Sequence, residues 1–155
     1  MNYKFILVHF SDRGKNMLKA KDIMTTNVIT VSRNASIYDA ITTLVEHHIT
    51  GLPVVDDDMT IVGVISEKDM LKKLYDVEDR AGKVDHFMTR MVITFDHEDS
   101  IMEICNCFIH NQFRRVPILD HGKVVGIISR ADIINYMLKL KSKDTVYATT
   151  AAGEI

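Results

Sequence analysis

Apolar residues recur with helical spacing in two stretches of the chain. In the first stretch, positions i, i+3, i+4, i+7 and i+8 hold Ile37, Ala40, Ile41, Leu44 and Val45. In the second stretch, the same positions hold Ile101, Ile104, Cys105, Phe108 and Ile109. This spacing lines one face, so it predicts two amphipathic helices. A serine precedes each helix, with an acidic residue three positions later, which is typical of a capping box.

Two apolar runs follow each predicted helix. The dipeptides at 54–55 and 118–119 each come directly after a proline and predict short strands. The runs at 61–65 and 124–128 are apolar almost throughout, which predicts strands buried on both faces. A polar turn separates the two strands of each pair, and a helix over about 67–76 or 130–141 closes each unit. The expected order is strand, helix, strand, strand, helix.

The two units are copies of each other at an offset of 64 residues. DIMTTNVITV at 22–31 aligns with HFMTRMVITF at 86–95, and the chain's only two prolines, Pro53 and Pro117, are equivalent. After a one-residue deletion, GVISEKD at 63–69 aligns with GIISRAD at 126–132. One unit has too little core alone, so we expect an α+β fold in which two pseudo-symmetric repeats pack into one module.

The repeats suggest a division of the chain into five parts. The expected boundaries are an N-terminal extension at 1–16, the first repeat at 17–75, a polar linker at 76–84, the second repeat at 85–141 and a C-terminal tail at 142–155.

Composition narrows the classes of function. The net charge is −2, which disfavours generic nucleic-acid binding. No apolar run approaches the ~18 residues of a membrane span, and the run at 3–10 lacks the features of a secretory signal. The two cysteines, Cys105 and Cys107, lie too close in sequence for a relaxed disulfide. We therefore expect a protein of the reducing cytoplasm that does not bind a membrane.

The repeated pattern M-T-x-x-V-I-T, helix, P-h-h-D, G-h-I-S-x-x-D, where h is hydrophobic, resembles a tandem cystathionine-beta-synthase (CBS) domain pair, or Bateman module. The resemblance covers residues 17–141, and no catalytic domain accompanies it. It implies that clefts between the repeats bind adenosine nucleotides (AMP, ADP or ATP) or S-adenosylmethionine. It also implies that the module regulates a partner protein in trans and forms a homodimer. The regulated partner cannot be named from the sequence, and no cofactor is expected beyond the regulatory nucleotide.

The Ser-x-x-Asp motif that ends each repeat has two interpretations. Ser66 and Ser129 could simply cap the following helices, with Asp69 and Asp132 stabilised in the first turn. The resemblance instead implies ligand binding, with each serine at the phosphate and each aspartate accepting the ribose hydroxyls. Because both aspartates are present, two sites are expected.

Adjacent arginines distinguish the two expected sites. Arg114 and Arg115 precede a buried strand, where the first repeat has Thr50-Gly51. Arginine binds phosphate through a bidentate fork, so these residues favour nucleotides over S-adenosylmethionine. The resemblance implies that the Asp69 site takes adenine contacts from the other repeat's first strand, at Met91, Val92 and Ile93, together with both arginines. The Asp132 site would use Asn27, Val28 and Ile29, with Arg114 from its own repeat.

Other chemistry finds little support. On a helix the Cys105 and Cys107 side chains would point about 200° apart, so a metal site with His110 is not expected. Nothing resembles a nucleophile–base pair or a Walker phosphate loop, so we expect no catalytic residues and no enzyme activity. The alternatives left open are a structural dimerisation module with empty sites and an S-adenosylmethionine sensor.

The closing helices carry more apolar residues than one buried face requires. They are Met70, Leu71, Leu74, Tyr75, Ile133, Ile134, Met137, Leu138 and Leu140. The core can cover one stripe, and the remainder needs another surface. We therefore expect a homodimer in which these helices pair.

Overall fold

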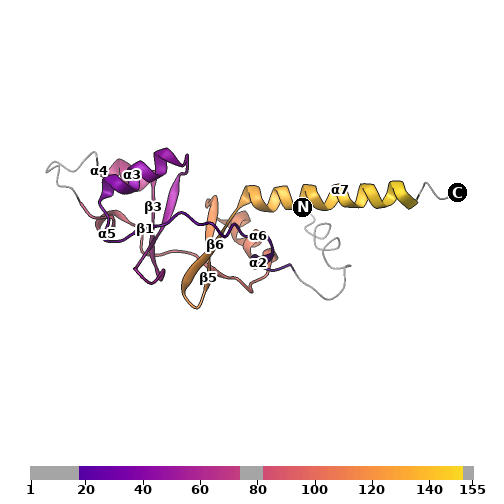
Figure 1. Cartoon of the computed structure of the whole chain (residues 1–155), viewed down its shortest axis with the longest axis horizontal. Helices are drawn as coiled ribbons and strands as arrows, with labels where there is room; N and C mark the ends of the chain where they lie inside the picture. Colours follow the sequence, from indigo (N-terminus) through magenta and orange to yellow (C-terminus); the bar gives the residue numbers. More distant parts are fainter. Residues whose placement is uncertain (1–17, 74–81, 152–155) are drawn as a thin grey trace.

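The computed structural model describes residues 18–73 and 82–151, which form two similar units side by side (Figure 1). The first repeat comprises β1 (Val31–Ser32), α3 (Ile37–Glu46), β2 (Gly51–Val55), β3 (Ile61–Ser66) and α4 (Glu67–Lys73). The second comprises β4 (Phe95–Asp96), α6 (Ile101–His110), β5 (Arg115–Asp120), β6 (Lys123–Ser129) and α7 (Arg130–Ala151). Two short helices, α2 (Ala20–Ile23) and α5 (Val84–Phe87), precede the repeats. The expected element order and the α+β class are confirmed.

Each repeat holds one three-stranded sheet. The strand orders are β1-β2-β3 and β4-β5-β6. In both sheets the short first strand pairs in parallel with the second, and the second pairs antiparallel with the third. The predicted capping boxes form as well, because Ser36 and Ser100 exchange hydrogen bonds with the third residue of α3 and α6. These caps fix where the covering helices begin.

Helix α7 is longer than its apolar pattern predicts. We expected an end near residue 141, but the helix continues to Ala151 and extends away from both sheets (Figure 1). Residues 142–151 contain neither glycine nor proline, so the backbone meets no helix breaker, and the first glycine follows at Gly153.

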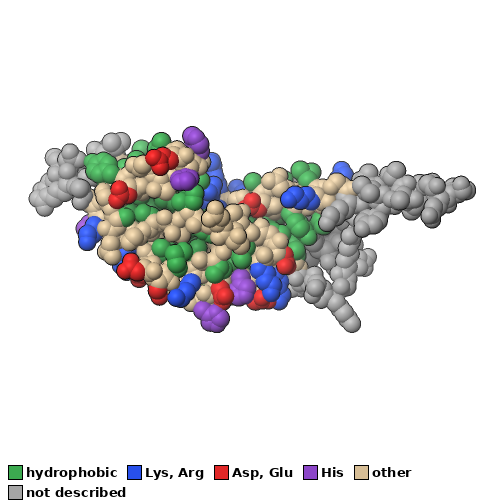
Figure 2. Space-filling view, in the orientation of Figure 1, with side chains coloured by type: hydrophobic (Ala, Val, Ile, Leu, Met, Phe, Trp, Pro, Cys, Tyr) green, Lys and Arg blue, Asp and Glu red, His purple; other side chains and the backbone are tan. Residues whose placement is uncertain are grey.

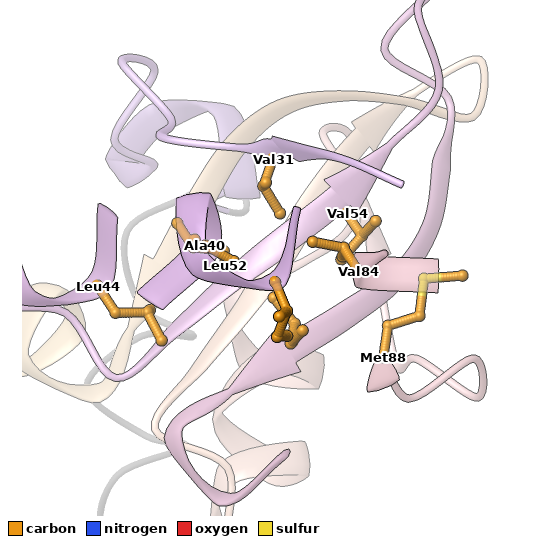
Figure 3. Packing of buried hydrophobic residues seen from close by; sticks show 9 residues of the cluster. Val31, Ala40, Leu44, Leu52, Val54, Val84 and Met88 are labelled. Carbon is orange, nitrogen blue, oxygen red and sulfur yellow. The ribbon is translucent and has the colours of Figure 1, made fainter. Parts of the chain in front are cut away.

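The two repeats exchange their leading segments. Val84 is fully buried and Met88 is 8% exposed, and both pack in the core of the first repeat with Val31, Leu52 and Val54 (Figure 3). Ala20 is likewise fully buried, but in the core of the second repeat. The short helices α2 and α5 thus each complete the core of the opposite repeat.

Backbone bridges to the opposite repeat, including Lys19–Ser100 and Ser36–Lys83, anchor the exchanged segments. Thr25 and Ile127 exchange two hydrogen bonds of 3.0 Å, and Thr89 and Val64 exchange bonds of 2.8 and 2.9 Å. These contacts cross from one repeat to the other, so the repeats are joined by more than their linker. The boundaries at 17–75 and 85–141 remain a prediction that follows sequence rather than packing.

Two other expectations concern the chain's less regular parts. The polar linker was placed at 76–84, but Val84 already begins α5 in the structure. Residues 76–81 lie outside the described residues, as does the extension at 1–16. Among the described residues, no helix is both long enough and apolar enough to cross a membrane.

The exchange also explains the repeated glycines. A Cβ added to Gly63 would lie 2.7 Å from Met88 Sδ and 2.9 Å from the Thr89 carbonyl oxygen. The three atoms nearest to a Cβ added to Gly126 would all be side-chain atoms of Met24, at 3.0 Å or less. Both glycines therefore allow the opposite repeat's Met-Thr segment to approach, and at Gly63 one of the nearest atoms is a backbone oxygen.

This difference gives a stability prediction. We expect Gly63→Ala to lower the free energy of unfolding by about 1–3 kcal/mol through overpacking. Adding Met24→Ala is expected to relieve Gly126→Ala, whereas adding Met88→Ala leaves much of the Gly63→Ala cost, because the carbonyl oxygen stays in place. Urea denaturation of the single and double variants measures both couplings. Equal relief in the two repeats would contradict this packing.

Candidate functional site

A cleft of about 550 Å³ lies between the two repeats. Its walls come from β2 and the β3–α4 junction of the first repeat, and from β5 and the segment before it in the second. The two equivalent prolines, Pro53 and Pro117, both line it, as do the equivalent Val64 and Ile127. The cleft therefore sits where the pseudo-symmetric halves meet.

The charge of this cleft is mainly positive. Lys68, Arg114 and Arg115 line it against a single carboxylate, Glu67. Arg115 Nε is buried and has no hydrogen-bond partner among the described residues. A buried donor without an acceptor is costly, so this atom is suited to an anionic ligand. By contrast, cationic and acidic side chains are interspersed over the face shown in Figure 2.

The predicted residues of the first site are only partly gathered here. Ser66, Arg114 and Arg115 line the cleft, as the sequence predicted. Asp69 lies behind Ser66 and is 4% exposed. Its Oδ2 accepts hydrogen bonds from Ser66 N at 3.0 Å and Ser66 Oγ at 2.8 Å. The capping geometry is therefore present, and the ribose role of Asp69 stays a prediction.

The second Ser-x-x-Asp motif has the same internal geometry. Asp132 Oδ2 accepts from Ser129 N at 2.7 Å and Ser129 Oγ at 2.8 Å, and Asp132 N donates to Ser129 Oγ at 3.1 Å. Neither residue lines the cleft described above. Ser129 lies opposite Arg115 in the β5–β6 ladder, so it is close to one of the cleft residues.

The expected adenine contacts do not lie on strands. Asn27, Val28 and Ile29 precede β1, and the segment 91–93 precedes β4, both in irregular backbone. The expectation of a first strand at these positions was wrong. Because each segment crosses from one repeat to the other, it pairs at a single bridge, Thr25 or Thr89, before it joins its own sheet.

Ionic contacts hold the second of these segments near the interface. Asp85 accepts from Arg33 Nη2 at 2.7 Å and from Arg90 Nη2 at 2.8 Å. The Arg90 and Arg33 guanidinium groups lower the pKa of the Asp85 carboxyl. Met91, which follows Arg90, is 94% exposed, and Ile93 is 44% exposed. These apolar side chains are thus presented to solvent beside the Val64–Thr89 bridge.

Lys68 and Phe113 are among the cleft residues that sequence reasoning did not single out. Lys68 stands inside the Ser66-x-x-Asp69 motif, where the second repeat has Ala131, and Phe113 immediately precedes the arginine pair. The positive charge of Lys68 has no counterpart at Ala131 of the second repeat, and this difference between the repeats could have pointed to Lys68.

Metal binding finds no geometric support in residues 18–73 and 82–151, where no cluster of three or more His, Cys, Asp or Glu side chains is arranged around a common point. Burial raises the pKa of the Cys105 thiol, and its side chain packs against the core of the second repeat. Cys105 therefore contributes to packing.

Comparison with known proteins identifies the family of this chain. The profile of the CBS domain matches the chain twice, at residues 20–76 and 84–139. An uncharacterized protein of Methanocaldococcus jannaschii is 32% identical over 135 residues, which are 87% of this chain and 47% of that protein. This chain therefore spans about half the length of that relative.

Two solved structures share the fold. CBSX2 of Arabidopsis thaliana, solved in complex with AMP, is 31% identical with a TM-score of 0.71, over 79% of this chain and 98% of that one. The CBS domain pair of protein MJ0100, solved with 5′-methylthioadenosine and S-adenosyl-L-methionine, is 30% identical with a TM-score of 0.66. It covers 79% of this chain and 97% of that one.

Proposed function

The chain belongs to the CBS domain family, and on that premise we propose that it is a regulatory module that binds adenosine nucleotides between its two repeats. The observation that carries this proposal is the cationic cleft, in which Ser66 of one repeat meets Arg114 and Arg115 of the other. A ligand with phosphate groups is expected to pair with the guanidinium groups of Arg114 and Arg115 and to balance the positive charge of the cleft.

The solved relatives support an adenosine-type ligand. CBSX2 has been solved with AMP, and the MJ0100 pair with 5′-methylthioadenosine and S-adenosyl-L-methionine. Among these ligands only AMP carries a phosphate, and S-adenosyl-L-methionine is a sulfonium cation. The charge of the cleft therefore favours AMP, ADP or ATP for this chain.

We propose that nucleotide binding controls a partner protein in trans, in the cytoplasm, rather than a reaction on this chain. A nucleotide that contacts both repeats changes their mutual contacts, and a partner can sense that change. The competing function is a structural dimerisation module whose sites stay empty. The exposed apolar residues described below fit either function, so ligand binding separates the two.

Native mass spectrometry of the purified protein tests the proposed function. We expect adducts whose mass matches an adenosine nucleotide, and their loss after unfolding and refolding in nucleotide-free buffer. Adducts restored by added AMP, but not by added GMP, would support the assignment to adenosine. A protein that stays free of every adenosine ligand, even when AMP is supplied, would favour the structural function.

Assembly as a homodimer is a second part of the proposal. Leu71 on α4 is 59% exposed, and Ile134 and Leu138 on α7 are 58% and 62% exposed. Two other members of the expected surface, Leu74 and Tyr75, lie outside the described residues. Exposed apolar side chains gathered on two helices favour burial against a second copy.

We expect light scattering at micromolar concentration to give the mass of two chains. The variant Leu138→Asp is expected to shift the protein toward the monomer, because it places a charge in the apolar contact. Val45→Asp is the matched control, since Val45 is 67% exposed on α3, outside this surface. A wild-type monomer, or equal effects of the two variants, would contradict pairing through α4 and α7.

A further inference from the structure

The two motif aspartates have different partners. Besides its bonds to Ser66, Asp69 accepts a hydrogen bond at Oδ1 from Lys72 Nζ at 2.8 Å. The Asp69 side chain is 6% exposed, whereas the Lys72 side chain is 62% exposed. Both carboxylate oxygens of Asp69 are therefore engaged within the chain, one of them by a lysine whose stem lies in solvent.

Asp132 lacks this lysine. Its Oδ2 is held by Ser129 as described above, but Oδ1 has no hydrogen-bond partner among the described residues. The residue equivalent to Lys72 in the second repeat is Asn135, which is exposed and carries no charge that could compete for Asp132. Asp132 is also only half-buried. One oxygen of this carboxylate is thus free to accept bonds from a ligand.

We propose that Lys72 makes the two nucleoside sites unequal, because it competes with the ligand's ribose hydroxyls for Asp69. The inference rests on the proposed function, in which each aspartate accepts those hydroxyls. A ligand at Asp69 must share Oδ1 with the ammonium group or displace it, whereas a ligand at Asp132 meets an available acceptor. Lys72 therefore lowers the affinity of the Asp69 site below what its phosphate contacts alone would give, and the Asp132 site has no such competitor.

The structure also bounds the size of this effect. Displacing Lys72 is feasible, since its side chain is mostly exposed and its ammonium group regains water on leaving. The cost falls on Asp69, which is buried and exchanges a charged partner for neutral hydroxyls. Exposed ion pairs are worth up to about 1 kcal/mol, and burial of one partner raises this, so we expect about a three- to tenfold difference in affinity.

Exchanging the two equivalent residues tests the proposal. Calorimetric titration of AMP is compared for the wild type, Lys72→Asn and Asn135→Lys. We expect Lys72→Asn to tighten the Asp69 step about three- to tenfold and Asn135→Lys to weaken the Asp132 step by a similar factor. Asp69→Ala and Asp132→Ala assign each step to its site. Lys139→Asn, which removes an exposed lysine of α7 away from both motifs, controls for net charge.

Each outcome is decisive. Affinities that neither exchange alters overturn the role of Lys72 and leave the proposed function standing. Absence of AMP binding in every protein overturns the proposed function itself. If Lys72→Asn lowers the melting temperature too far for titration, Asn135→Lys still tests the proposal, because it adds the competitor to the other site.

Discussion

Replacing Asp132 by alanine is expected to weaken AMP binding at one site by roughly ten- to a hundredfold. In the proposed site the carboxylate accepts hydrogen bonds from the ligand, and bonds to a charged acceptor are worth about 1.5–3 kcal/mol. Asp69→Ala is expected to weaken the other site, by less, because Lys72 already competes for that carboxylate. Calorimetry measures the affinities, and thermal unfolding measures the effect on stability.

The capping interpretation predicts a different result. If each aspartate serves only to cap a helix, its removal lowers the melting temperature and leaves AMP affinity unchanged. Asp39→Ala is the matched control, because Asp39 accepts a hydrogen bond from Ser36 N at 3.2 Å in the same capping arrangement on α3. A loss of stability like that of Asp39→Ala, with unaltered affinity, would show that the Ser-x-x-Asp motifs are structural.

The second large effect concerns the phosphate. We expect adenosine to bind at least about tenfold more weakly than AMP, because it cannot meet Arg114 and Arg115. Arg115→Lys is expected to reduce AMP affinity, since lysine keeps the charge and loses the guanidinium fork. S-adenosylmethionine is not expected to displace the nucleotides, and added salt is expected to weaken AMP binding only moderately, because the cleft partly shields the arginines.

Competition titrations with adenosine, AMP, ATP and S-adenosylmethionine measure this order. Adenosine is also the internal control, because Arg115→Lys is expected to leave its affinity unaltered. Tight binding of S-adenosylmethionine that is insensitive to Arg114 and Arg115 substitution would show that the ligand class is wrong.

The fold was largely predictable from the sequence. The helices at 37–46 and 101–110 carry strong apolar periodicity and capping boxes, and each element of one repeat could be checked against its equivalent in the other. The exchange of α2 and α5 was not predicted, because a four-residue helix is barely longer than one turn and has little periodicity to detect. The repeated apolar residues at Ile23-Met24 and Phe87-Met88 were a weak signal of it.

The candidate site was predictable in part. Ser66, Arg114 and Arg115 come together because they occupy strand ends that the repeat symmetry directs to one interface. Phe113 and Lys68 line the same cleft because they are close neighbours of Arg114 and Ser66 in the sequence, and the motif pattern did not single them out. Lys72 was missed for another reason. It lies three residues after Asp69 on the same helix, a common spacing for ion pairs, and the prediction did not consider that such a pair could compete with a ligand.

The central claim is that this CBS domain pair binds an adenosine nucleotide across its repeats. A crystal structure of the protein with AMP tests it most directly, since it shows ligand, cleft and both motifs together. The account predicts AMP in the cleft with its phosphate at Arg114 and Arg115 and its ribose hydroxyls at Asp69, and a second AMP with its ribose hydroxyls at Asp132. AMP bound elsewhere on the protein would contradict the claim. A cleft that stays empty in crystals soaked with AMP would contradict it as well.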